Sequence, residues 1–339
     1  MPTHRLRLLY AGSPDIAVPA LVRLGFEAEI VGVLTNPESQ KGRGLGLAAT
    51  PVAEAAASVF QGAVPVLAFE RLDAAAREAV AALAPELLVS FAYGRIFGPK
   101  FLALFPRGGI NVHPSLLPRW RGPTPIPAAI LARDSETGVS VQRLAPGVDE
   151  GDLLATQRLP LRGTETTDDL SWTAGLVGAD LVAGVVADIA AGREVALPQE
   201  GTPLYCGLIR KDDGLVDWNE PVLDLYARLR AYSPWPGAFT WFKGQRLNLL
   251  EAVPYRGMTY AAPAGSLDWT EAAPPGTVLG LDKSLGLVVQ GKDGLVALRR
   301  LQLQHKKALG FREFANGVRD LVGATLGATA GQAESGRIP

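Results

Sequence analysis

The chain has few cysteines and histidines. Its 339 residues include one cysteine, Cys206, and three histidines, His4, His113 and His305. A single cysteine excludes an intramolecular disulfide, and three scattered imidazoles do not give the ligand spacing of a structural zinc site. We therefore predict a protein that carries no metal and no disulfide.

Long uncharged hydrophobic runs are also missing. The most apolar stretch, residues 174–191, carries Asp180 and Asp188, and charges inside hydrocarbon are costly. The first residues lack both the apolar core of a signal peptide and the Arg/Ser-rich pattern of a transit peptide. We expect a cytoplasmic protein that does not span a membrane.

An excess of positive charge is absent as well. The chain has 33 Lys and Arg against 34 Asp and Glu, a net charge of −1. Nucleic acids are usually bound by concentrated positive charge, so only its distribution could indicate such a partner. A local basic run, Arg299 to Arg312 with Lys306 and Lys307, lies in the last third of the chain. Composition alone is equally compatible with a solvated edge of a small domain.

Short apolar runs alternate with amphipathic segments in the first part of the chain. We predict strands at residues 6–10, 30–34, 64–67, 87–91 and 109–112, and helices at residues 51–60 and 72–83. Ser13 is predicted to cap a first helix that begins at Pro14. Such alternation predicts a parallel sheet covered by helices on both faces, with ligands beyond the carboxyl ends of its strands.

The pattern changes after a predicted helix at residues 168–191. Glycines and prolines in residues 192–206 indicate a connection between domains. Short runs between glycine and proline turns follow, at residues 238–242, 246–250, 276–279 and 295–298. They are typical of a small antiparallel barrel, with the oligonucleotide-binding (OB) type as one option. We predict an α/β domain over 1–191, a linker over 192–206, an OB-like domain over 207–326 and a tail over 327–339.

The residues best suited to chemistry follow the strand predicted at 109–112. Asn111 and His113 are two positions apart, so both can point to one face of an extended segment. Their N–H groups could stabilise an oxyanion, and Asp149 could orient the imidazole and raise its pKa. The alternative is structural: a hydrogen-bonded histidine beside Pro114, an asparagine satisfying a turn, and an ordinary turn acid. Spacing alone leaves both interpretations open.

Asn111-x-His113, the segment Ser115–Pro118 and Asp149-x-Gly151-Asp152 together resemble the signature of folate-dependent formyltransferases. The resemblance implies a Rossmann-like first domain in which Asn111, His113 and Asp149 are catalytic. It places Ser115, Leu116, Leu117 and Pro118 against the folate, and Phe91, Tyr93 and Gly94 at its ring pocket. The implied formyl donor is 10-formyltetrahydrofolate.

Two further segments resemble methionyl-tRNA formyltransferases in particular. Residues 41–46 resemble the insertion with which those enzymes reach the acceptor end of tRNA, and residues 209–218 resemble the entry to their C-terminal barrel. The glycine-rich loop 41–46 lacks the Gly-Lys-Ser/Thr ending of a phosphate-binding loop, although it could be a flexible linker. The tRNA contacts that we predict are Lys41, Arg43, Arg210, Lys211, Lys306 and Lys307.

The sequence therefore predicts transfer of a formyl group to the α-amine of initiator methionyl-tRNA for translation initiation, by a monomer. Two alternatives stay open. One is a formyltransferase that acts on an amino-sugar nucleotide with the same catalytic trio. The other is a tRNA-binding protein without catalysis, against which the intact Asn111, His113 and Asp149 argue.

Overall fold

The computed structural model describes residues 5–41, 46–255 and 273–327. The chain divides into two compact units. The first takes in residues up to 129 together with 135–162 and 169–208, and the second takes in 130–134, 163–168 and the residues from 209 onward. Arg43, one of the predicted tRNA contacts, lies outside the described residues.

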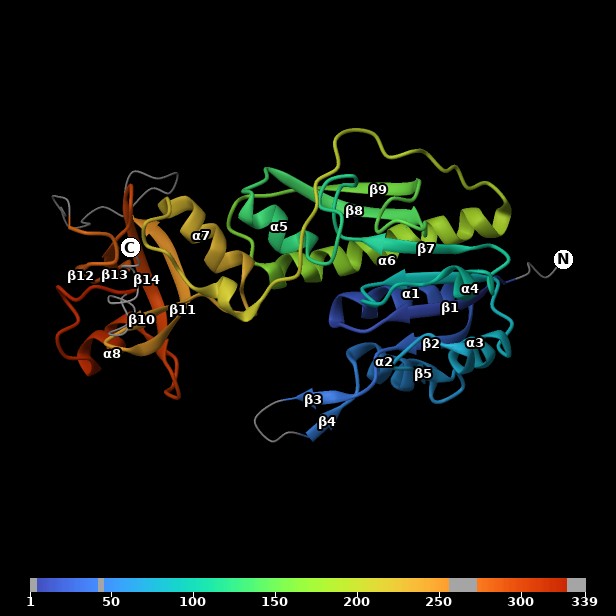
Figure 1. Ribbon diagram of the computed structural model, residues 1–339, viewed down its shortest axis with the longest axis horizontal. Coiled ribbons are helices and arrows are strands. Elements are labelled where there is room, and N and C mark those ends of the chain that lie inside the picture. Colours follow the sequence, from blue (N-terminus) through green and yellow to red (C-terminus); the bar gives the residue numbers. More distant parts are fainter. Residues whose placement is uncertain (1–4, 42–45, 256–272, 328–339) are drawn as a thin grey trace, which may run out of the picture. The chain divides into compact units, whose positions relative to one another are not determined.

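The first unit is built on a seven-stranded sheet of order β5-β2-β1-β6-β7-β8-β9 (Figure 1). Its parallel strands are β1 (Arg7–Gly12), β2 (Glu29–Thr35), β5 (Val66–Ala68), β6 (Leu87–Phe91) and β7 (Gly109–His113). These strands confirm the predicted α/β domain. The sheet continues through two antiparallel strands that the sequence did not predict, β8 (Glu136–Arg143) and β9 (Leu153–Pro160).

Helices flank this sheet, and a small hairpin projects from it (Figure 1). The helices are η1 (Asp15–Ala17), α1 (Val18–Glu27), α2 (Pro51–Phe60), α3 (Ala74–Ala81), α4 (Pro99–Leu102), α5 (Pro125–Leu131) and α6 (Thr167–Ala191). The hairpin consists of β3 (Ser39–Lys41) and β4 (Gly46–Ala48), so it carries the predicted tRNA-contacting loop. The expectation for Ser13 was wrong: its hydroxyl accepts hydrogen bonds from Asn36 instead of capping the first helix.

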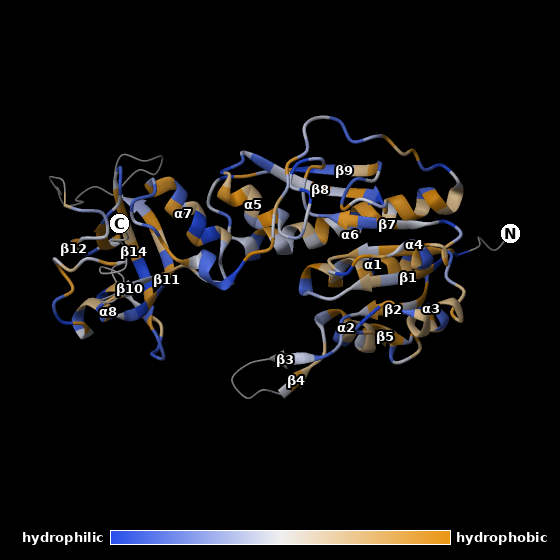
Figure 2. Ribbon diagram, in the orientation of Figure 1, coloured by the Kyte–Doolittle hydropathy of each residue, from blue (hydrophilic) through white to orange (hydrophobic). Residues whose placement is uncertain are grey.

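Helix α6 is long and apolar enough to cross a membrane by length and composition, and hydrophobic residues recur along its length (Figure 2). Packing within the first unit accounts for this composition. Gly178 lies so close to the sheet that a Cβ there would be 3.0 Å from Val112, and Asp180 pairs with Arg23 on α1. The glycines allow helix and sheet to approach closely.

The second unit contains an antiparallel sheet of order β10-β11-β14-β13-β12, with β15 paired to β14. Its elements are η2 (Lys211–Gly214), α7 (Val222–Ala231), β10 (Phe239–Phe242), β11 (Gln245–Tyr255), β12 (Val278–Asp282), β13 (Gly286–Gln290), β14 (Leu295–Leu303), β15 (Leu309–Gly310) and α8 (Phe311–Gly317). The two edge strands are bridged by residues 323–327. Gly323 donates its backbone N–H to Val278 on β12, and Gly327 donates to Trp241 on β10. The sheet confirms the predicted antiparallel second domain, and these two bonds tie both of its edge strands to one segment.

Residues 192–206, predicted to connect the domains, are bonded along the first unit. Leu197 and Leu153 exchange two backbone hydrogen bonds, with N···O distances of 2.7 and 2.9 Å. Arg121 donates its backbone N–H to Leu204 and accepts one from Cys206. The connecting segment therefore belongs to the surroundings of the predicted site as well.

Candidate active site

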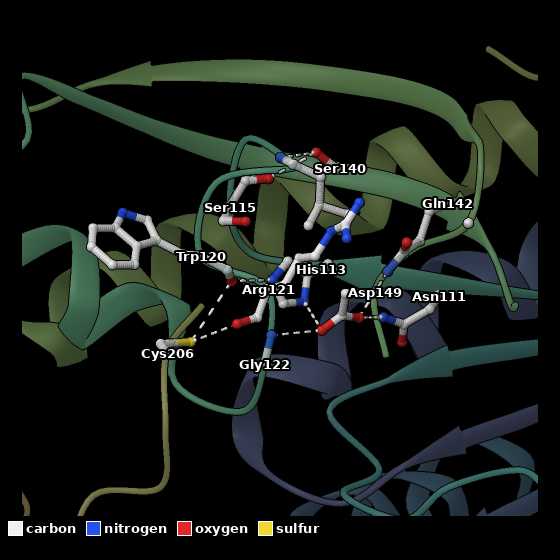
Figure 3. Close-up of polar contacts among 12 residues, drawn as sticks. Asn111, His113, Ser115, Trp120, Arg121, Gly122, Ser140, Gln142, Asp149 and Cys206 are labelled. Atoms are coloured by element: carbon white, nitrogen blue, oxygen red, sulfur yellow. Dashed lines mark hydrogen bonds and ion pairs between the residues drawn. The ribbon is translucent and has the colours of Figure 1, made fainter. Parts of the chain in front are cut away.

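The predicted catalytic residues lie close together at the carboxyl end of β7 in the first unit. Asn111 and His113 lie on β7, which is hydrogen-bonded between β6 and β8. The turn between β8 and β9 returns Asp149 to the same place (Figure 3). The sequence placed these three residues together correctly.

His113 is held between two acceptors. Its Nε2 lies 2.9 Å from the backbone carbonyl of Trp120, and its Nδ1 lies 3.5 Å from Oδ2 of Asp149. A carbonyl can only accept, so Nε2 carries the hydrogen. The remaining nitrogen, Nδ1, faces the carboxylate.

Burial lowers the pKa of His113 below its usual value of 6.5, against the opposing attraction of Asp149 and the hydrogen bond to Trp120. The side chain is only 4% exposed, and desolvation disfavours the charged imidazolium. Asp149 raises this pKa, as expected from its charge, but burial has the larger effect. Burial therefore favours the neutral imidazole.

Asp149 is fixed by three N–H donors. Its Oδ2 accepts from the backbone of Gly122 at 2.9 Å, and its Oδ1 accepts from Gln142 at 2.8 Å and from Asn111 at 3.5 Å. Its backbone has φ of +55°, a left-handed conformation that costs roughly 1–2 kcal/mol for an L-residue. Surrounding contacts must offset this cost, and they aim the carboxylate at His113.

Two glycines allow the backbone to fold tightly around Asp149. Gly122 has φ of +112°, and a Cβ there would lie 2.3 Å from the carbonyl of Cys206. A Cβ on Gly151 would lie 1.8 Å from the carbonyl of Arg143. Only glycine fits at either position without moving the backbone.

Asn111 is the donor left for a substrate. Its side-chain contact with Asp149 is long, and its amide nitrogen carries a second hydrogen. Asn111 is half-buried, whereas both nitrogens of His113 already face protein acceptors. The arrangement thus combines an amide donor with a neutral imidazole that a carboxylate supports, which suits transfer of an acyl group to an amine.

Comparison with known proteins agrees with this chemistry. Residues 17–174 match the family described as formyl transferase, and residues 208–319 match the formyl transferase C-terminal domain. The methionyl-tRNA formyltransferase of Treponema pallidum is 44% identical over 328 residues, covering 95% of this chain and 99% of that protein. The one from Treponema denticola is 41% identical over 323 residues, covering 94% and 98%. The chain belongs to the methionyl-tRNA formyltransferase family.

A solved structure shares the fold at low sequence identity. HypX from Aquifex aeolicus, solved in complex with tetrahydrofolic acid, is similar with a TM-score of 0.62 and 16% identity. The similarity covers 94% of this chain and 48% of HypX. Membership of the formyltransferase family makes this chain an enzyme whose formyl transfer is linked to folate.

The segment Ser115–Pro118, which in this family is expected to face folate, forms a rigid turn against β8. Ser115 donates its hydroxyl to the carbonyl of Arg119 at 2.6 Å. The hydroxyl of Ser140, on β8, donates to the carbonyl of Ser115 and accepts from the N–H of Leu117. These bonds tie the turn to β8, while Leu116 and Pro118 are partly exposed.

The second segment expected to face folate, residues 91–94, directs its large side chains inward. Phe91 packs against Gly178 on α6, and Tyr93 is 2% exposed and stacks on Phe97. Gly94 has φ of +82°, with open space where a Cβ would be. The hydroxyl of Tyr93 is buried, and no hydrogen-bond partner for it is found within the described part of the chain. An unpartnered polar atom and open backbone fit a polar ring system, and folate contact stays a prediction.

Four of the residues predicted to contact tRNA are exposed and lie in or beside turns of the second unit. Arg210 and Lys211 flank the start of η2, and Lys306 and Lys307 lie in the turn after β14. The backbone of Lys41 ends β3. Accessible cations of this kind are suited to phosphate contacts in a methionyl-tRNA formyltransferase.

Sequence reasoning missed several residues of the site. Gln142 and Gln199 bond to Asp149, the carbonyl of Trp120 bonds to His113, and Gly122 provides a backbone donor. Gly122, followed by Pro123, could have signalled a tight turn, but nothing in the sequence marked the glutamines. Within the described ranges, no group of three His, Cys, Asp or Glu residues could hold a metal ion.

Proposed function

We propose that this enzyme transfers the formyl group of 10-formyltetrahydrofolate to the α-amine of methionine on its initiator tRNA, giving N-formylmethionyl-tRNA. The observation that carries the proposal is the 41–44% identity, over almost the whole chain, to methionyl-tRNA formyltransferases. The assembled Asn111, His113 and Asp149 support it. A role in translation initiation implies a cytoplasmic enzyme, and we propose that it acts as a monomer.

The attacking group is the neutral methionyl amine, so the protein needs no nucleophile of its own. As the amine nitrogen bonds to the formyl carbon, the carbonyl oxygen gains negative charge. Asn111 donates its free amide N–H to that oxygen. The folate supplies the one-carbon group, and the bond between the formyl carbon and N10 of the folate breaks when the oxyanion collapses.

His113 and Asp149 move the proton that the amine must lose. The Nδ1 of His113 and the Oδ2 of Asp149, 3.5 Å apart, take up this proton between them, while Nε2–H stays bonded to the carbonyl of Trp120. The pair then returns the proton to the departing N10, so no net charge is left on the protein. Asp149 serves by stabilising the imidazolium that forms briefly.

The test is formyl transfer to charged initiator methionyl-tRNA with purified wild-type protein and two variants. We expect His113→Ala to lower kcat at least a hundredfold. The control, Gln157→Ala, changes an exposed side chain on β9 of the first unit and should retain wild-type turnover. A wild-type enzyme that formylates an amino-sugar nucleotide but not tRNA would replace the proposal with the sugar alternative. Tight tRNA binding without any transfer would favour a non-catalytic role.

The domain assignment is part of the same proposal. We propose that residues 1–191 catalyse the reaction and that residues 207–326 bind tRNA, with 192–206 connecting them and 327–339 forming a tail. The exposed cations Arg210, Lys211, Lys306 and Lys307 support the second role. Lys41 and Arg43, at the end of β3 and in the loop after it, are proposed to contact the acceptor end.

A further inference from the structure

Two glutamines from separate segments meet behind Asp149. Gln142 lies on β8 and is 1% exposed, and its Nε2 is 2.8 Å from Oδ1 of Asp149. Gln199 lies in the connecting segment, where its Nε2 is 2.9 Å from the carbonyl of Asp149 and 2.8 Å from that of Gly151. One glutamine therefore holds the carboxylate and the other holds the backbone that carries it.

The chemistry of their partners fixes the orientation of both amides. The Oδ1 of Asp149 faces Gln142 as an acceptor, so the NH₂ of Gln142 must point to it and its Oε1 must point away. That oxygen lies 3.3 Å from the Nε2 of Gln199. The Oε1 of Gln199 accepts from Nε and Nη2 of Arg121 at 3.1 and 2.8 Å. A guanidinium can only donate, so neither amide can flip without losing its bonds.

The result is one directed network from a cation to the catalytic carboxylate. Arg121 donates to Gln199, Gln199 donates to the turn around Asp149, and Gln142 donates to the carboxylate itself. Arg121 is held in turn by Glu150 at 3.3 Å and by the hydroxyl of Tyr205 at 3.1 Å. Every buried polar atom of the two glutamine side chains is used, which favours a single geometry.

We propose that Gln142 and Gln199 are positioning residues that lock Asp149 in its left-handed conformation and aim its carboxylate at His113. The segment that connects the two units thereby supplies part of the catalytic geometry through Gln199. This inference rests on the proposed formyl transfer, because the two glutamines affect the reaction rate only through the position of Asp149. A glutamine that merely filled space would need neither donor in a fixed direction.

The test compares kinetics of Gln142→Met and Gln199→Met, which keep similar volume but remove the hydrogen bonds. We expect kcat to fall on the order of a hundredfold for each, as small misplacements of a catalytic group do. KM for both substrates should stay near wild type, and the melting temperature should fall by only a few degrees. Gln157→Met, on the neighbouring strand β9 and exposed, is the matched control. If Gln142→Met and Gln199→Met both keep kcat within about twofold of wild type, the proposal is overturned.

The pH dependence of activity distinguishes a positioning role for Gln142 from a general loss of structure. In Gln142→Glu, the carboxyl can replace the lost donor only when it is protonated, so activity relative to wild type should rise as pH falls. Asp149 faces this position directly, while His113 acts on it through Asp149 and Arg121 acts through Gln199. Gln142→Met should show no such rise. A flat ratio for Gln142→Glu across the acid range would contradict direct donation to Asp149.

A structural measurement keeps the inference distinct from the choice of acceptor. The crystal structure of Gln199→Met should show Asp149 out of the left-handed region or rotated away from His113, whatever amine the enzyme formylates. If wild type fails with tRNA while the variant shows this displacement, the proposed acceptor fails and the positioning role stands. An Asp149 that keeps its position in Gln199→Met would overturn the role of Gln199.

Discussion

At the scale of single residues, burial and charge act on His113 in opposite directions, and burial dominates. Its pKa lies below the usual 6.5 because desolvation outweighs the attraction of Asp149. Since the neutral form accepts the proton, kcat/KM should be constant above that pKa and fall as pH drops through it. Replacing Asp149 by Asn removes the attraction, so the acid limb should move to lower pH while the rate falls overall.

Rate profiles from about pH 5 to 8 with both proteins would check this prediction. The substrate amine also loses its nucleophilicity when protonated, but that limb belongs to the substrate and cannot move in the variant. An acid limb at the same pH in Asp149→Asn and wild type would therefore assign it to the amine and contradict the role given to His113.

Asn111 allows a second prediction at this scale. Asn111→Ala removes the one amide donor of the trio that still has a free hydrogen. We expect kcat to fall by roughly a hundredfold to a thousandfold, with KM little changed, because the lost bond forms mainly in the transition state. Single-turnover formylation measures the effect, and Asn316→Ala on α8 is the control. A large rise in KM at unchanged kcat would show that Asn111 binds the ground state instead.

At the scale of elements, the packing of helix α6 against the rest of the first unit depends on small residues. A Cβ at Gly175 would lie 2.9 Å from the backbone carbonyl of Ile16, whereas Gly184 is exposed with no atom within 4 Å of its Cβ position. Gly184→Ala should stabilise the protein by about 0.5–1 kcal/mol through helix propensity. Gly175→Ala should destabilise it by about 1–3 kcal/mol through overpacking. Urea unfolding of the two variants measures the difference, and equal shifts of the same sign would refute the packing argument.

Elements also show where sequence reasoning stopped. The parallel strands and α2 were predictable because apolar runs and caps repeat the βα pattern, as with Thr50 capping α2. Strand β8 was missed because polar Ser140 and Gln142 interrupt its apolar residues, although both are buried. They are polar because Ser140 bonds the Ser115 turn and Gln142 bonds Asp149. The positions that hid the strand are those that build the site.

Over the whole molecule, the sequence was sufficient for an α/β part followed by an antiparallel part, because strand ends are local features, and it grouped Asn111, His113 and Asp149 through the resemblance to formyltransferases. It could not supply the pKa of His113, because burial depends on the packed neighbours of the fold. The sequence also predicted a linker at residues 192–206, because this segment contains glycines and prolines. The bonds of Gln199 to Asp149 join positions 50 residues apart, and only the folded chain brings them together.

Because tRNA is the proposed substrate of the whole enzyme, the dependence of kcat/KM on salt concentration tests where its phosphates are bound. Lys306 and Lys307 are exposed in the turn that follows β14, and Lys292 is exposed in the turn that precedes it. If the first pair contacts phosphates, Lys306→Ala with Lys307→Ala should raise KM for tRNA. It should also reduce the slope of log(kcat/KM) against log[salt] by about 1.5, because each lost contact removes released counterions.

Lys292→Ala removes a similar charge at the opposite end of the same strand and should leave the slope within experimental error. The comparison matters because the chain carries a net charge of −1, so general attraction cannot account for tRNA affinity. A loss of slope in Lys292→Ala equal to half that in the double variant would mean that the second unit acts through its overall charge. Loss confined to the double variant would place the phosphate contacts in the turn after β14.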